Sequence, residues 1–356
     1  MKCEKPQARS TRPRLRCLDD GVSLYRDAVR LLVTGGAGFI GSHFVRRMLG
    51  AGENVIVLDK FTYAGNADNL PSELDCHRGD IATREDVDQI GPVDAIVNFA
   101  AETHVDRSIF GPEDFVRTDV LGTLVLLQAA QELSARLVQV STDEVYGDVE
   151  PGWSSREDDP LHPSSPYSAS KAGGDLQVLA AVRTFGVNAS ITRGSNTYGP
   201  NQYPEKILPL FATNALDGEP LPLYGDGRQV RDWLHVDDHC AAIELVLRQG
   251  EAGEVYNVGA SEEHENVELT RLIVEHLGVD ASLVRNVEDR AGHDRRYSLD
   301  TAKIRSLGWE PRRDWKEGIR ATIDWYRDNR AWWEPIKRSD SFREYYEKQY
   351  AARLSS

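Results

Sequence analysis

A tyrosine and a lysine four residues apart, preceded by two adjacent carboxylates, are the residues of this sequence best suited to chemistry. Tyr167 and Lys171 fall on one face of a helix predicted over residues 166–185. Tyrosine ordinarily titrates at about pH 10, and a neighbouring ammonium together with a bound cationic cofactor can lower that pKa toward the range of a general base. Asp143 and Glu144 follow a predicted strand directly. The Tyr–Lys pair therefore predicts proton transfer coupled to redox chemistry, and the two carboxylates predict elimination of water.

A glycine-rich turn follows the first apolar run of the chain. Arg30–Thr34 predicts a strand, Gly35–Gly41 forms the turn, and Ser42–Leu49 predicts a helix. Alone, such a turn can be purely structural. A second apolar run, Asn54–Leu58, ends at Asp59, whose carboxylate can accept hydrogen bonds from ribose hydroxyls and would repel a 2′-phosphate. Strand, turn, helix and acid together predict a dinucleotide site that takes NAD rather than NADP.

Length, charge and cysteine content exclude several classes of protein. The chain has 356 residues and a formal net charge of −15, which argues against nucleic acid or an anionic membrane as a partner. No apolar run approaches the roughly 18 residues of a membrane span. Cys3, Cys17, Cys76 and Cys240 are scattered, which predicts reduced thiols in a cytoplasmic protein and no metal site. The basic-rich segment 1–29 lacks a following apolar stretch and predicts a flexible extension rather than a secretory signal.

Strands and helices alternate through the first half of the sequence. Val93–Ala101 and Arg136–Ser141 predict strands, whereas Thr118–Leu133 and Pro166–Phe185 predict helices. This alternation predicts an α/β fold, a Rossmann-type doubly wound parallel sheet. Ligands bind such sheets at the carboxyl ends of the strands, where the two catalytic carboxylates lie, and Gly147–Ser165 predicts an exposed loop over the mouth of that site.

The second half predicts a smaller C-terminal lobe interleaved with the sheet. Its expected segments are a turn at Ser195–Pro200, the start of a helix at Pro204–Leu210, an extended piece at Leu221–Gly227, a strand at Val230–His235 and a helix at Val236–Arg248. We expect residues 30–195 to bind NAD, with about 230–250 returning to that domain, residues 196–335 to form mainly the substrate lobe, and residues 336–356 to form a tail. The tryptophans between 309 and 333 predict core or interface.

These residues closely resemble the extended short-chain dehydrogenase/reductase superfamily and, within it, the dTDP-glucose 4,6-dehydratase family. The resemblance runs from about Arg30 to Trp333. It is carried by Thr34–Gly41, Thr62–Asn66, Phe99–Ile109, Ser141–Gly147, Tyr167–Lys171, Asn201–Leu210, Pro222–Gly227 and Arg290–Tyr297. The Thr-Asp-Glu at 142–144 best distinguishes this family from its relatives, because related 4-epimerases and decarboxylases usually carry small or uncharged residues there.

The resemblance implies a three-stage reaction on a nucleotide sugar. Tyr167 takes the proton of the glucose 4-hydroxyl, Thr142 holds that oxygen, and hydride passes from C4 to NAD. Glu144 then removes the C5 proton, and Asp143 protonates the departing 6-hydroxyl. Hydride finally returns to C6, which gives dTDP-4-keto-6-deoxyglucose. Asp143 can carry a proton near neutral pH if burial beside ionised Glu144 raises its pKa.

The resemblance also assigns binding residues and a homodimer. Expected at the cofactor are Gly35, Gly38, Phe39, Ile40, Gly41, Asp59, Lys60, Phe61, Thr62, Asp80, Ile81, Phe99, Ala100, Ala101, Glu102, Thr103, Thr118, Tyr167, Lys171 and Thr197. Expected at the nucleotide sugar are Thr103, Thr142, Asn196, Lys206, Ile207, Pro222, Leu223, Tyr224, Arg231, Asn266, Arg290 and His293. Helices around Gly111–Leu133 and Pro166–Phe185 are expected to form the dimer interface.

Four positions depart from the family pattern, and other functions stay open. Thr103 replaces the family's Ser, and Thr197 and Asp119 each replace an Asn. Gly194 replaces a Cys, and this last change is expected to be without consequence. A nucleotide-sugar 4-epimerase or UDP-glucuronate decarboxylase is the main alternative, and a non-catalytic NAD(H)-binding sensor is a further one. The adjacent carboxylates Asp143 and Glu144 disfavour the epimerase or decarboxylase, and the Tyr167–Lys171 pair disfavours the sensor. Both dTDP- and UDP-glucose stay open as substrates.

Overall fold

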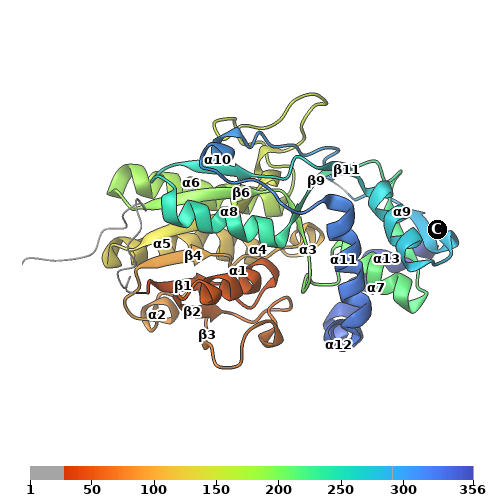
Figure 1. Cartoon of the computed structure of the whole chain (residues 1–356), viewed down its shortest axis with the longest axis horizontal. Helices are drawn as coiled ribbons and strands as arrows, with labels where there is room; N and C mark the ends of the chain where they lie inside the picture. The colour runs from red at the N-terminus through yellow and green to blue at the C-terminus, as the bar shows by residue number, and fades with distance from the viewer. Residues whose placement is uncertain (1–27, 291, 356) are drawn as a thin grey trace, which may run out of the picture.

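A seven-stranded parallel sheet forms the centre of the computed structural model, which describes residues 28–290 and 292–355 (Figure 1). The strand order is β10-β6-β5-β4-β1-β2-β3, and all neighbours run parallel. The strands are β1 (Arg30–Thr34), β2 (Asn54–Asp59), β3 (Asp75–Arg78), β4 (Ala95–Asn98), β5 (Arg136–Thr142), β6 (Ala189–Gly194) and β10 (Val255–Val258). The predicted Rossmann-type sheet is confirmed, and its strand order reverses between β1 and β4.

Helices cover both faces of this sheet. One face carries α1 (Phe39–Gly50) and α8 (Val236–Gln249), and the other carries α2 (Arg84–Asp88), α5 (Thr123–Leu133) and α6 (Pro166–Phe185) (Figure 1). Alternate strand residues serve the two faces: Leu31 and Val33 belong to the apolar core under α1 and α8, and Leu32 belongs to the core under α5. Strands buried on both faces are apolar throughout, which explains their readable sequence signal.

Two predicted elements of the sheet domain differ from the structure. β4 covers only 95–98, because the chain leaves the sheet at Phe99 to line the site. The helix expected from Thr118 is preceded by α3 (Val105–Phe110) and α4 (Pro112–Phe115), and it starts as the π-helix η2 (Val116–Gly122), which continues into α5. Packing here is close, since a Cβ added at Gly122 would lie 2.5 Å from Ile81 Cδ1.

A second, smaller lobe lies at the right of Figure 1. Its strands are β7 (Asn196–Tyr198), β9 (Val230–His235) and β11 (Glu263–Glu265) in one sheet, and β8 (Leu221–Tyr224) and β12 (Val284–Val287) in another. Its helices are α7 (Ile207–Asp217), α9 (Asn266–Leu277), α11 (Trp315–Asp328), α12 (Arg330–Arg338) and α13 (Asp340–Ser355). Short elements elsewhere are η1 (Ala67–Asn69), η3 (Asp143–Tyr146), η4 (Ala281–Leu283) and α10 (Ala302–Ser306). The chain crosses between lobes repeatedly: β9 belongs to the small sheet, whereas α8 and β10 return to the large one.

The C-terminal part of the chain is more ordered than the sequence indicates. The segment expected as a tail contains the whole of α13, which lies near α7 and contacts it through the hydrogen bond from Asn214 Nδ2 to the Tyr346 hydroxyl (Figure 1). Ser195–Pro200, expected to be a turn, contains the strand β7. Trp315 and Trp333 are buried in the core of the small lobe, and Trp309 is buried against the large sheet. The predicted core role of the tryptophans is confirmed.

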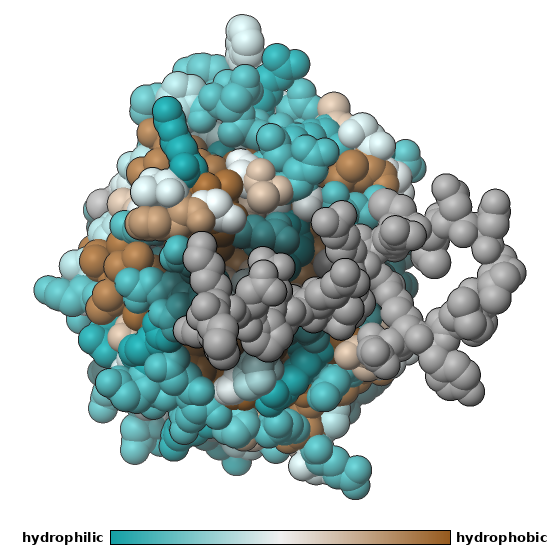
Figure 2. Space-filling model, turned by 90° about the vertical axis from the view of Figure 1, so that its left-hand side faces the viewer, coloured by the Kyte–Doolittle hydropathy of each residue, from teal (hydrophilic) through white to brown (hydrophobic). Residues whose placement is uncertain are grey.

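The predicted extension 1–29, with Cys3 and Cys17, falls almost wholly outside the described residues. Within 28–290 and 292–355, no helix is both long and apolar enough to cross a bilayer, and no cluster of His, Cys, Asp and Glu is suited to holding a metal ion. Cys76 is an exposed free thiol and Cys240 a buried one. The face shown in Figure 2 is largely hydrophilic, with hydrophobic residues in small areas.

A buried ion pair joins the ends of β5 and β6 to α6. Arg193 Nε lies 2.8 Å from Asp175 Oδ2, and both side chains are almost fully buried. Arg193 Nη1 donates to the Tyr146 hydroxyl at 2.8 Å, and that hydroxyl donates to Asn257 Oδ1 of β10. The network thereby fixes η3, the turn that carries two of the candidate catalytic residues.

We predict that Asp175→Ala lowers the free energy of unfolding by about 3–5 kcal/mol, because it leaves the Arg193 guanidinium buried and unpaired. Arg84→Ala is the control, since Arg84 forms exposed ion pairs with Asp88 and Glu132 and its loss should cost less than about 1 kcal/mol. Urea unfolding followed by circular dichroism measures both. Equal losses of unfolding free energy in the two variants would contradict the structural role of the buried Asp175–Arg193 pair.

Candidate active site

The glycine turn after β1 has the shape of a diphosphate cradle. Gly35 has φ +68°, and a Cβ added there would lie 2.5 Å from the backbone nitrogen of Ala100. A Cβ at Gly41 would lie 2.3 Å from the Gly35 carbonyl oxygen. α1 begins at this turn, and Gly38 at its N-cap offers no side chain to its first N–H groups. Those N–H groups and the helix dipole fit an anionic pyrophosphate, so the residues present suit NAD.

Asp59 closes the ribose end of this cradle at the end of β2. Its Oδ2 accepts a hydrogen bond from the Ala37 N–H at 2.9 Å, and its Oδ1 accepts one from the Phe61 N–H at 2.7 Å. These bonds fix the carboxylate where it faces the groove described below. Lys60, next in sequence, is engaged by Asp80 at 3.1 Å, so its charge does not create a site for a 2′-phosphate.

One continuous groove joins the cradle to the catalytic residues. Of the predicted site residues, it is lined by Gly35, Gly38, Phe39, Ile40, Gly41, Asp59, Lys60, Thr62, Asp80, Ile81, Phe99, Ala100, Ala101, Glu102, Thr103, Thr118, Thr142, Asp143, Glu144, Tyr167, Lys171, Asn196, Thr197 and Lys206. Phe61 contributes its backbone to Asp59 and does not line the groove. Burial raises the pKa of Glu102 to about 7.

Two elements bring the catalytic set together. β5 ends at Thr142, whose Oγ1 accepts a hydrogen bond from the Glu144 N–H at 3.3 Å and so starts η3. α6 begins one residue before Tyr167 with a serine capping box and a proline in its first turn. One helical turn later, Lys171 Nζ donates to the Val140 carbonyl oxygen at 2.8 Å. The end of β5 and the start of α6 thus place five side chains along one groove: Thr142, Asp143, Glu144, Tyr167 and Lys171.

Asp143 is suited to act as an acid. It is buried, and its Oδ2 has no hydrogen-bond partner among the described residues. Burial, followed by the neighbouring Glu144 carboxylate, raises the pKa of Asp143 well above its ordinary value. The predicted rise of the Asp143 pKa is confirmed, and a neutral Asp143 can donate a proton at neutral pH.

In the protein without its cofactor, the pKa of Tyr167 is raised rather than lowered. Burial, followed by the carboxylates of Glu144 and Asp119, raises the pKa of Tyr167 well above its ordinary value. Lys171 Nζ is bonded to a carbonyl oxygen and lies 4.0 Å from Asp119 Oδ1. The predicted lowering, by Lys171 together with a bound cationic cofactor, stays a prediction. Tyr167 therefore keeps its proton until a further positive charge enters the site.

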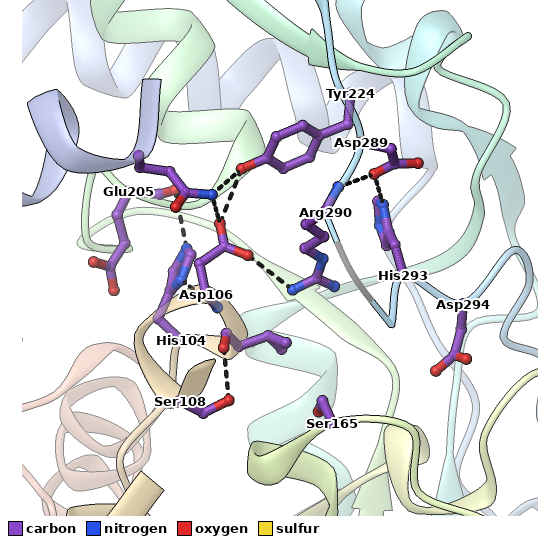
Figure 3. Close-up of polar contacts among 12 residues, drawn as sticks. His104, Asp106, Ser108, Ser165, Glu205, Tyr224, Asp289, Arg290, His293 and Asp294 are labelled. Carbon is purple, nitrogen blue, oxygen red and sulfur yellow. Dashed lines mark hydrogen bonds and ion pairs between the residues drawn. The ribbon is translucent and has the colours of Figure 1, made fainter. Parts of the chain in front are cut away.

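The residues predicted for the nucleotide sugar lie mostly beyond the groove, in the small lobe. Ile207 starts α7, Pro222, Leu223 and Tyr224 lie on β8, Arg231 lies on β9, Asn266 starts α9, and Arg290 and His293 follow β12. The Tyr224 and His293 rings meet edge to face with centroids 5.9 Å apart, and both lie beside Arg290 (Figure 3). Arg231 Nη2 is held by the Asp294 carbonyl oxygen at 2.9 Å. Leu223 is buried in the core of the lobe.

Known proteins match this chain over most of its length. The model of the GDP-mannose 4,6 dehydratase family matches residues 32–322. A dTDP-glucose 4,6-dehydratase of Streptomyces antibioticus is 55% identical over 322 residues, which cover 87% of this chain and 96% of the relative. The structure of the dTDP-glucose 4,6-dehydratase DesIV from Streptomyces venezuelae, with NAD and dTDP bound, has a TM-score of 0.84 and 54% identity and covers 86% of this chain and 100% of its own. The chain belongs to the dTDP-glucose 4,6-dehydratase family.

The dTDP-glucose 4,6-dehydratase family shares this fold with other enzymes. A UDP-glucose 4-epimerase from Thermus thermophilus, solved with NAD, has a TM-score of 0.80 at 34% identity and covers 84% of this chain and 99% of its own. The backbone alone therefore does not separate dehydration from epimerisation, and the residues on it must do so.

Two departures from the dehydratase pattern meet at a histidine that the sequence did not single out. His239 Nδ1 lies 2.8 Å from Thr197 Oγ1, and burial lowers the pKa of His239 to about 4, so the ring is neutral. A Cβ at Gly194 would lie 2.5 Å from that ring. Any larger residue at position 194 would therefore displace His239, so the glycine matches the place of this ring. That the change from Cys to Gly has no consequence for function stays a prediction.

The third departure places an ionisable group beside the catalytic lysine. Asp119 lies in η2, is almost fully buried, and accepts a hydrogen bond from Ser170 Oγ at 2.6 Å. Its other oxygen is 4.0 Å from Lys171 Nζ. Burial, only partly offset by Lys171, raises the pKa of Asp119 to about 6. The asparagine that the family resemblance implies for this position would carry no charge.

Sequence reasoning missed several other side chains. Asp106 falls within the stretch after β4 that the sequence places at the site, but it received no role. Gln349 of α13 carries no motif at all. Glu205 is buried and holds Arg107 and the Tyr63 hydroxyl at 2.8 and 2.9 Å. A carboxylate directly before predicted ligand Lys206 was the available signal.

We predict that Asp119→Asn shifts the acid limb of the pH profile for hydride removal to lower pH by about one unit. Above its pKa of about 6, ionised Asp119 opposes the Tyr167 phenolate, and the amide removes that opposition. Single-turnover formation of enzyme-bound NADH across pH 5–9 measures the shift. Asp114→Asn, an exposed carboxylate of α4, is the control and should leave the profile unmoved; an unmoved profile in Asp119→Asn would contradict the coupling.

Proposed function

We infer that this chain is a dTDP-glucose 4,6-dehydratase. It dehydrates dTDP-glucose to dTDP-4-keto-6-deoxyglucose and recycles its NAD within each turnover. The observation that carries this conclusion is the buried Asp143 with a raised pKa beside Glu144, on the same groove as Tyr167 and Lys171. An acid and a second base next to a redox tyrosine are needed to eliminate water and are superfluous for epimerisation. The retained Tyr–Lys pair speaks against a sensor without activity.

The division of labour among the residues follows from their protonation. NAD⁺, when bound, supplies the hydride acceptor and a positive charge near Tyr167. Tyr167 then removes the 4-hydroxyl proton, and the Thr142 hydroxyl, which lines the same groove, steadies the sugar oxygen. Glu144 removes the C5 proton made acidic by the 4-ketone. Asp143, which keeps its proton because it is buried, gives it to the leaving 6-hydroxyl.

The cofactor cradle belongs to the large sheet, and the sugar-binding residues belong to the small lobe. We propose that residues 30–195, with part of 230–250, bind NAD, and that residues 196–335 bind mainly the nucleotide sugar. α13 adds residues of 336–356 to this lobe. The cytoplasmic location inferred from cysteine usage stays a prediction.

The activity is tested directly by incubating the purified protein with dTDP-glucose and, separately, with UDP-glucose. Mass spectrometry should show loss of one water from dTDP-glucose without added reductant or oxidant. Recovery of the corresponding galactose isomer, with unchanged mass, would instead establish the epimerase.

We also propose that the protein is a homodimer. Apolar side chains are exposed in the single chain on the helices expected at the interface: Val116 and Leu121 on η2, and Leu176 and Phe185 on α6. Ile109 and Phe110 of the preceding helix α3 are exposed as well. Leu176 is 58% exposed and Phe185 62% exposed. A second copy of the same helices, packed by twofold symmetry, would cover them.

Glu144→Gln and Tyr167→Phe should fail at different stages. Tyr167→Phe lacks the first base, so little NADH forms. Glu144→Gln keeps that base and should form NADH but stall before water is lost. Loss of a positioned proton-transfer group typically slows a step by about 10²–10⁴-fold. Single-turnover absorbance of NADH, with exchange of the C5 proton into deuterated water, separates the two; exchange at the wild-type rate in Glu144→Gln would remove Glu144 as the C5 base.

Sedimentation should give twice the chain mass of 39.8 kDa. Leu176→Asp should shift the species toward monomer, because it puts a charge into the apolar interface. Trp153→Ser is the control: Trp153 is 72% exposed but lies in a loop outside these helices, so this variant should stay dimeric. A wild-type monomer, or a dimer unaffected by Leu176→Asp, would refute this interface.

A further inference from the structure

Asp106 is a buried carboxylate on which side chains from three other segments of the chain converge (Figure 3). It lies in α3. Its Oδ1 accepts a hydrogen bond from Arg290 Nη1 at 3.1 Å. Its Oδ2 accepts hydrogen bonds from the Tyr224 hydroxyl at 3.0 Å and from Gln349 Nε2 at 2.9 Å, and the Tyr345 hydroxyl lies 3.5 Å away. Asp106 is 3% exposed, so its lone pairs are directed at protein donors rather than at water.

Asp106 hydrogen-bonds only one nitrogen of the Arg290 guanidinium. Nη1 is bonded to Asp106, whereas Arg290 Nε is buried and has no hydrogen-bond partner among the described residues. Nε and Nη2 form the other edge of the planar fork, the edge that matches two oxygens of a phosphate. Asp106 therefore fixes the plane of the guanidinium and leaves its bidentate edge for a ligand.

The last helix completes this arrangement. Tyr345 and Gln349 are buried and lie four residues apart on one face of α13, and Tyr350 next to Gln349 is buried as well. The Gln349 amide also hydrogen-bonds the Tyr224 hydroxyl. The Tyr345 ring covers the Arg107 guanidinium, with Arg107 Cζ 4.3 Å from the ring centroid. α13 thus holds Asp106 from the side opposite to Arg290.

Electrostatics keep Asp106 charged despite its burial. Burial alone raises the pKa of a carboxyl group, but three neighbours outweigh this effect and hold the pKa of Asp106 below its ordinary value: His104, which is protonated only at acid pH, then Arg290, then the Tyr224 hydroxyl. The neighbouring His104 is neutral, since burial lowers its pKa to about 4, and its Nδ1 accepts the Asp106 N–H at 3.2 Å. The charge facing Arg290 is therefore a carboxylate held in place from several sides.

We propose that Asp106 and Gln349 are positioning residues for the nucleotide diphosphate: Gln349 of α13 holds Asp106, and Asp106 orients the Nε–Nη2 edge of Arg290 toward the phosphate oxygens. This inference rests on the proposed function, because it takes the diphosphate of dTDP-glucose as the ligand. It assigns the C-terminal helix to the substrate site, although none of its described side chains lines the cofactor groove.

Calorimetric titration with dTDP and steady-state kinetics with dTDP-glucose test the proposal. Asp106→Asn should weaken dTDP binding and raise the KM for dTDP-glucose by about 10- to 100-fold, the value of a charge-assisted hydrogen bond, while kcat and NAD content change less than about threefold. Gln349→Leu, similar in volume, should move the same parameters in the same direction by a smaller factor. Glu347→Gln, an exposed neighbour on α13, is the matched control and should match the wild type.

The pairing with Arg290 makes the test specific. If Asp106 acts through Arg290, then Asp106→Asn should weaken dTDP binding no further in an Arg290→Ala background. Effects that add in the double variant, or unchanged dTDP affinity in Gln349→Leu and Asp106→Asn, would overturn the proposal. If Asp106→Asn fails to fold, Gln349→Leu alone, with and without Arg290→Ala, decides the outcome in the same way. A wild-type protein that neither binds dTDP nor dehydrates dTDP-glucose would instead refute the proposed function.

Discussion

The rest of this structure depends on one constraint: solvent is excluded from side chains at the carboxyl edge of the parallel sheet. All seven strands run in one direction, so their ends and the starts of α1 and α6 meet there. Burial raises the pKa values of Asp143, Asp119 and Tyr167 together. The same low polarity that keeps Asp143 protonated also strengthens each hydrogen bond and ion pair around it. Acid chemistry at neutral pH is thus a property of the sheet edge as much as of one residue.

The two halves of the site use different physical means. The cofactor half is built from backbone: glycines that admit close approach, free N–H groups at the start of α1, and Asp59 fixed by two N–H donors. The sugar half is built from charged side chains that pair with one another in the small lobe. Backbone geometry is rigid once the sheet has formed, whereas Arg290 needs Asp106 to hold its orientation.

Most residues predicted for the cofactor line one groove, whereas most of those predicted for the sugar lie outside it, for physical reasons. The glycine turn, Asp59 and the Tyr167–Lys171 spacing are local patterns, and local patterns survive in sequence. The raised pKa of Tyr167 in the absence of cofactor was not predicted, because it depends on burial and on Glu144 and Asp119 from other segments, which no spacing reveals. Gln349 was missed for the same reason: it lies 243 positions from Asp106. β10 and β7 escaped notice because they are only four and three residues long.

Because the two lobes are interleaved, neither lobe is a single continuous segment of the chain. The cofactor-binding sheet takes β10 and the covering helix α8 from sequence that lies beyond the first strands of the small lobe. A gene fragment ending near residue 195 would leave the apolar surfaces of β5 and β6 bare, including Val138 and Val140, which pack in the same core as α8. Recombination that exchanges one lobe between relatives therefore cannot cut the chain once. It needs several coordinated crossovers, so new sugar specificities in this architecture are more accessible by point substitution than by exchange of domains.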